Sequence, residues 1–154
     1  MRHLIAIFIL LGSYTAHAHH WVRDVYDSSQ RFIIEVEVRR FQLINPHPLM
    51  FVEITGIPVE PTADGIEVGQ TWTLEMDNRR ELVALGWDSE TFLPGDELTV
   101  AVDPSRSTWY RENTLYLRAV EHAREGFVYL HNVRRLYPIE PGGDNLERYL
   151  DEIN

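Results

Sequence analysis

Apolar and polar residues alternate between positions 31 and 44, and this pattern predicts a long strand with one buried face. Positions 32, 34, 36 and 38 are apolar, whereas positions 35, 37 and 39 are charged. The segment Asn45-Pro46-His47-Pro48 ends the strand, because proline cannot donate a backbone hydrogen bond. A strand that returns over residues 49–55 is expected next.

The rest of the pattern predicts further short strands and a single helix. The helix is expected over residues 79–85, where Asp77 or Asn78 is suited to cap its start and Gly86 to follow its end. Turns are expected at 93–96 and 103–106, and an exposed loop at 56–69. The remaining predicted strands cover residues 71–76, 97–102, 114–120 and 127–133.

This order of elements predicts a mainly β protein. Three strands, one short helix and then two or three more strands match a small antiparallel barrel of the OB type, with the helix between the third and fourth strands. A β-sandwich is the alternative fold, because alternation alone does not separate the two architectures.

The first eighteen residues have the pattern of a secretory signal peptide. Arg2 precedes an apolar run over residues 4–11, and small residues flank position 17 in Ala16-His17-Ala18. Cleavage after Ala18 gives a predicted division into a signal peptide (1–18), a β-barrel domain (19–133) and a C-terminal extension (134–154). No second apolar run follows, so we expect no membrane span in the mature chain and a periplasmic or secreted location.

Composition narrows the classes of function. The chain carries 24 acidic and 14 basic residues, a formal net charge of −10, and the predicted leader removes an arginine but no acid. Such a charge makes nucleic acid an unfavourable partner. There is no cysteine and no lysine, which excludes disulfides, thiolate ligands and lysine-based catalysis.

Cleavage after Ala18 would create a candidate metal site. His19 would then offer its α-amine and its imidazole to one ion, and His20 or His47 would supply a third nitrogen. A nitrogen-rich site of this kind suits copper, and after it zinc or nickel. The sequence thus predicts His19, His20 and His47 as metal ligands, with copper as the preferred cofactor and zinc as the alternative.

Other interpretations remain open. The alternative function is a non-enzymatic adaptor whose barrel presents an aromatic face to a protein or a small ligand, in which case the histidines have no functional role. Trp109-Tyr110-Arg111 is the best candidate for such a contact. Trp72 and Trp87 are expected in the core. His122 and His131 are expected to make ordinary hydrogen bonds or to face solvent. No nucleophile elbow or phosphate-binding glycine pattern is present, so we do not expect an enzyme, although a copper-dependent oxidase remains a third hypothesis.

The order and spacing of several motifs resemble one protein family. The motifs are His19-His20, Asn45-Pro46-His47, Trp72-Thr73-Leu74-Glu75, Leu85-Gly86-Trp87 and the run from Leu93 to Val100. Together they are similar to the exported bacterial family called domain of unknown function 6152 (DUF6152), over about residues 19–106. Trp21-Val22 departs from that pattern, in which Ser-Phe is common. The resemblance implies a signal peptide and a small β-rich domain, and it implies no particular activity.

Overall fold

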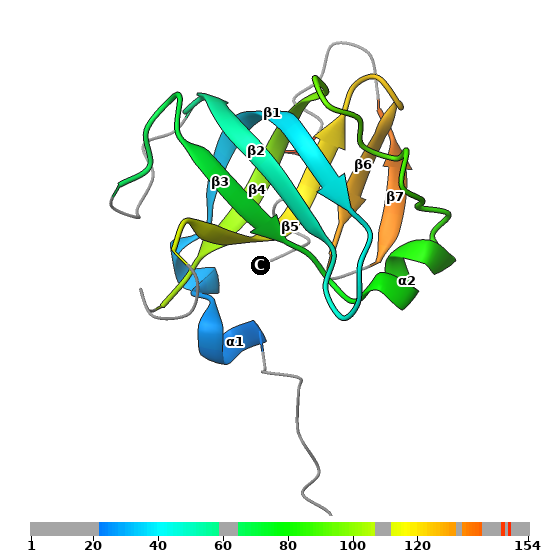
Figure 1. Ribbon diagram of the computed structural model, residues 1–154, viewed down its shortest axis with the longest axis horizontal. Helices are drawn as coiled ribbons and strands as arrows, with labels where there is room; N and C mark the ends of the chain where they lie inside the picture. The colour runs from blue at the N-terminus through cyan, green and yellow to red at the C-terminus, as the bar shows by residue number, and fades with distance from the viewer. Residues whose placement is uncertain are drawn as a thin grey trace, which may run out of the picture.

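The computed structural model describes residues 22–58, 65–106, 112–131 and 134–139, together with Leu146 and Arg148. The described part is mainly β, with short helices near its start and after its third strand (Figure 1). The elements in chain order are α1 (Val22–Val25), the 3-10 helix η1 (Ser28–Gln30), β1 (Phe32–Gln42), β2 (Leu49–Gly56), β3 (Thr71–Glu75), α2 (Arg79–Ala84), β4 (Glu97–Pro104), β5 (Thr114–His122), β6 (Phe127–Leu130) and β7 (Arg135–Pro138).

Five of these strands close into a barrel. β1 pairs with β2 on one side and with β4 on the other, β2 pairs with β3, and β4 pairs with β5, all antiparallel. The barrel closes where β3 runs parallel to β5, from Thr73 beside Thr114 to Glu75 beside Tyr116. The predicted OB-like barrel with a helix between its third and fourth strands is confirmed, and the β-sandwich is not the architecture.

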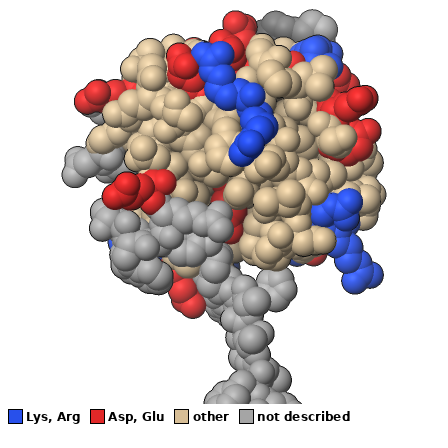
Figure 2. Space-filling view, viewed as in Figure 1, with Lys and Arg blue, Asp and Glu red and all other residues tan. Residues whose placement is uncertain are grey.

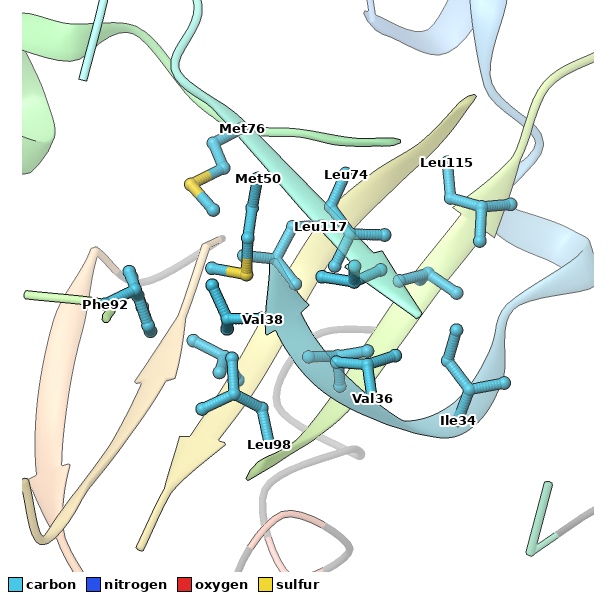
Figure 3. Packing of buried hydrophobic residues seen from close by; sticks show 14 of the residues in the cluster. Ile34, Val36, Val38, Met50, Leu74, Met76, Phe92, Leu98, Leu115 and Leu117 are labelled. Carbon is cyan, nitrogen blue, oxygen red and sulfur yellow. The ribbon is translucent and has the colours of Figure 1, made fainter. Parts of the chain in front are cut away.

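The barrel interior is filled by the apolar positions that the alternation predicts. Val36 and Val38 of β1 are fully buried, and so is Met50 of β2. In Figure 3, Val38, Met50 and Leu117 point toward one another from three different strands. The long strand therefore buries the face that its sequence indicates, and its charged face lies outside.

The sheet continues beyond the barrel. β5 extends to His122 and pairs with β6, and β6 pairs with β7, so the sheet runs past residue 133 into the predicted C-terminal extension. Leu146 is also buried, on the outer side of the sheet with Ile33 and Ala119. The strand predicted over 127–133 is instead the shorter β6, after which the described chain returns as β7.

The segment 103–106 differs from its predicted turn. Asp103 and Pro104 belong to β4, and Ser105 forms a β-bridge with Tyr26. Proline has no backbone N–H to donate, but its carbonyl can still accept a hydrogen bond from a neighbouring strand. The Pro104 carbonyl accepts one from the Asp27 N–H, at 2.9 Å. The Asp-Pro pair therefore extends the strand because the N-terminal segment pairs with it.

Helix α2 begins at a side-chain cap. The Asn78 side-chain oxygen accepts a hydrogen bond from the Glu81 N–H at 3.0 Å. After the helix, Gly86 has φ +94°, a conformation that favours glycine. The chain then enters an aromatic cluster in which Trp87 packs edge-on to Phe92 and Tyr129. The Asn78 cap and Gly86 thus define where the helical segment begins and ends.

Replacing Asn78 with alanine is expected to destabilise the protein by about 1 kcal/mol, because the cap to the Glu81 N–H is lost. The loss is measurable by urea unfolding followed by tryptophan fluorescence. The control is Asn78→Asp, since aspartate caps as well as asparagine. Equal destabilisation by the two substitutions would contradict a capping role.

Candidate functional site

Of the three predicted metal ligands, His47 is the one that lies within the described residues. His19 and His20 lie outside the described residues, which begin at Val22. His47 lies in the turn between β1 and β2 and is half-buried. Figure 1 shows this turn, α1 and α2 at the same end of the barrel. The side chains that the described residues bring to that end of the barrel therefore decide what His47 can contact.

His47 is held in a defined orientation. Its Nδ1 atom lies 3.1 Å from the backbone oxygen of Met76. Because a carbonyl only accepts, Nδ1 must carry the proton, and the neutral ring then has its lone pair on Nε2. Metal-bound histidines commonly donate their second ring nitrogen in this way. Backbone bonds from Met76 to Pro48 and from Arg79 to Pro46 fix the turn beside this site.

The N-terminal segment is anchored at the same place. The Tyr26 hydroxyl donates to the Glu75 carboxylate at 2.9 Å, and both side chains are buried. The Tyr26 ring also packs against Tyr116, with 5.0 Å between the ring centroids. The Arg106 N–H donates to the Val25 carbonyl at 2.7 Å. These contacts fix the described start of the chain against the seam between β3 and β5.

His131 also reaches this end of the barrel, from the turn after β6. Its Nδ1 atom lies 3.4 Å from Oδ2 of Asp77, and its ring meets Tyr116 edge-on, with 5.3 Å between the centroids. Neither of the two facing polar atoms makes a hydrogen bond within the described part of the chain. Burial, reinforced by nearby Arg118 and Arg134, lowers the pKa of His131 to about 4, so the imidazole is neutral at pH 7.

Three segments distant in sequence thus meet three consecutive residues. Residues 75–77, at and just after the end of β3, form what we call the β3 junction. Tyr26 of the N-terminal segment contacts Glu75, His47 of the first turn contacts Met76, and His131 of the last turn contacts Asp77. The sequence predicts His47 here but gives no signal for His131, because its partner Asp77 is far away along the chain.

The acidic residue Glu81 and the basic residue Arg134 both lie beside the junction. Glu81, on the first turn of α2, pairs with Arg134 at 2.9 Å. Burial raises the pKa of Glu81, and the neighbouring Asp77 carboxylate raises it further. Within the described ranges, no three histidine, aspartate or glutamate side chains form a group that could hold a metal ion.

Only some of the aromatic residues considered for a binding face lie within the described part of the chain. Trp87 is in the core as expected; Trp72 is only partly buried, packs against the core and donates its Nε1–H to Gln70 at 3.0 Å. Trp21 and the Trp109-Tyr110-Arg111 segment lie outside the described residues. On the face shown in Figure 2, basic groups are separate, acidic groups lie mainly near the edge, and much of the described surface is uncharged. No single sign of charge dominates that face.

Comparison with known proteins places the chain in a family. No curated protein matches the sequence. None of the described helices is long and apolar enough to cross a bilayer. A family model, described as a family of unknown function (DUF6152), matches residues 8–112, which include β1 to β4 and the whole β3 junction. The resemblance seen in the sequence is therefore confirmed, and the chain belongs to the DUF6152 family.

Proposed function

We propose that this protein is an exported, non-enzymatic barrel that binds a transition-metal ion through His19, His20 and His47, with copper preferred over zinc. Cleavage after Ala18 frees the α-amine of His19, which chelates one ion together with its own imidazole. His20 or His47 supplies the next nitrogen. The protein then works in the periplasm or after secretion.

The convergence on the β3 junction carries this proposal. Tyr26 and His47 contact the consecutive residues Glu75 and Met76, so the anchored N-terminal segment and the His47 turn share one location. Two residues lie between His19 and Val22, and the three peptide bonds that join them span at most about 10 Å when extended.

Two further properties favour a cation. The Met76 carbonyl fixes the tautomer of His47 that leaves Nε2 able to coordinate. The net charge of −10 favours the approach of positive ions over negative ones. Donors that are mainly neutral nitrogens select Cu(II) or Zn(II) rather than Mg²⁺ or Ca²⁺.

A copper titration tests the site. Mature protein with an authentic His19 is compared with a form that carries one extra glycine before His19, and Cu(II) affinity is measured by calorimetry against a competing chelator. The extra residue moves the amine away from the His19 imidazole, so affinity is expected to fall about 100-fold or more. His47→Ala, in the authentic form, is expected to lower affinity about tenfold.

Equal and weak binding by the authentic and extended forms would overturn the amine-based site. Unchanged affinity in His47→Ala would remove that ligand alone. Export is tested separately: the protein recovered from outside the cytoplasm of an expressing bacterium should have His19 as its first residue by mass spectrometry. A different mature terminus, or retention of residues 1–18, would contradict that part of the proposal.

A further inference from the structure

We propose that a pocket between the β1–β2 turn and α2 binds the carboxylate of a small organic molecule through Arg79 and Arg80. Both arginines line this pocket, together with Asn45 and Asn78. Its volume is about 510 Å³, which lies within the range of sites that take small ligands. The inference uses none of the proposed metal ligands, so it goes beyond the proposed function and does not depend on it.

The two walls of the pocket are hydrogen-bonded to each other. The Arg79 backbone N–H donates to the Pro46 carbonyl at 3.2 Å, and the Arg79 Nε–H donates to the Leu43 carbonyl at 3.0 Å. These bonds hold the turn against the first residue of α2 and orient the Arg79 guanidinium group. A pocket that is already formed before binding loses less conformational entropy when a ligand enters.

The polar groups that remain available in the pocket are mainly hydrogen-bond donors. The terminal nitrogens of Arg79 make no hydrogen bond among the described residues, and neither does the Arg80 side chain. The Asn78 side-chain oxygen already accepts from the Glu81 N–H, which leaves the Asn78 amide hydrogens to donate. Guanidinium groups present their N–H bonds in a planar fork that matches the two oxygens of a carboxylate.

The charges of the pocket wall favour an anion. Glu81 is the acidic residue that lines the pocket, and it pairs with Arg134 at 2.9 Å. Neither Arg79 nor Arg80 pairs with an acidic side chain within the described ranges. Figure 2 shows basic side chains at the lower right of the view, where Figure 1 places α2. The positive charges of the two arginines are therefore available to a ligand.

The rest of the molecule favours an organic anion with a single charge. The chain carries a net charge of −10, which repels a dianion more strongly than a monoanion. A carboxylate is thus favoured over a phosphate. Pro46 and Ala84 give the pocket apolar surface, which suits an organic group attached to the carboxylate.

Titration of the metal-free protein with benzoate tests the site. Inorganic phosphate is the competing anion, and benzyl alcohol is the neutral analogue that lacks the carboxylate. In nuclear magnetic resonance spectra, benzoate is expected to shift the backbone amide signals of Asn45 and Arg80, whereas benzyl alcohol at the same concentration leaves them in place. Benzoate shifts confined to other parts of the chain, equal binding of benzyl alcohol, or tighter binding of phosphate than of benzoate would each overturn the inference.

Arginine variants separate the pocket from the general surface. Arg80→Gln removes an exposed charge, and Arg79→Lys keeps the charge but loses the forked donors; each is expected to weaken benzoate binding about tenfold. Arg39→Gln is the matched control, because Arg39 lies on β1, pairs with Glu53 at 2.7 Å and does not line the pocket. Wild-type affinity in Arg80→Gln, or an equal loss in Arg39→Gln, would show that no specific anion site exists here.

Discussion

Asp103→Asn is expected to destabilise the protein by about 3–5 kcal/mol. The Asp103 side chain is fully buried, and its two oxygens accept from Arg31 Nε at 2.8 Å and from Arg118 Nε at 2.5 Å. Both arginine side chains are at least nine-tenths buried. The substitution keeps the size of the side chain, so the loss comes from removing the negative charge between two shielded guanidinium groups.

Urea unfolding at pH 7 measures this loss, and an exposed ion pair supplies the control. Glu53 pairs with Arg39 at 2.7 Å, but about a third or more of each side chain is exposed. Glu53→Gln removes the same charge and is expected to cost less than about 1 kcal/mol. Similar losses in the two variants would show that burial of the Asp103 pair contributes nothing to stability.

The barrel itself was predictable from local pattern. Alternation along β1 indicates which face is buried, Pro46 and Pro48 mark its end, and Asn78 and Gly86 mark the ends of the helical segment. These signals depend on neighbours a few residues apart. The turn predicted at Asp103-Pro104 was wrong because its local signal is overridden by Arg31, Arg118 and the pairing of Ser105 with Tyr26.

The candidate site was predictable only in part. His47 could be chosen because it stands in a proline-flanked turn, and the described chain places it at the end of the barrel. His131 could not, because its surroundings come from Asp77 and Tyr116, on two other segments of the chain. The position of His19 and His20 remains a prediction. The β3 junction joins segments that are far apart along the chain. Contacts of this kind leave no local pattern of apolar and polar residues from which they could be predicted.

Acidification of the metal-free protein from pH 6.5 to 4 is expected to remove about 3 kcal/mol of stability through His131 alone. Burial lowers the pKa of this imidazole from 6.5 to about 4 in the folded chain. As the pH falls below 6.5, the unfolded chain takes up the proton first, so unfolding becomes more favourable. Once the pH is below about 4, the folded chain is protonated too and the loss is complete.

Comparison of the wild type with His131→Asn isolates this contribution. Burial lowers the pKa of His122, and Arg124 and the Leu93 N–H lower the pKa of Asp96, so both groups also make the protein less stable in acid. The raised pKa of Glu81 has the opposite effect. These groups remain in the variant. Urea unfolding at pH 7, 5.5 and 4 should show the stability of His131→Asn falling less steeply. Parallel curves would mean that His131 takes up its proton equally in both states. In that case its ring would not be shielded by the β3 junction.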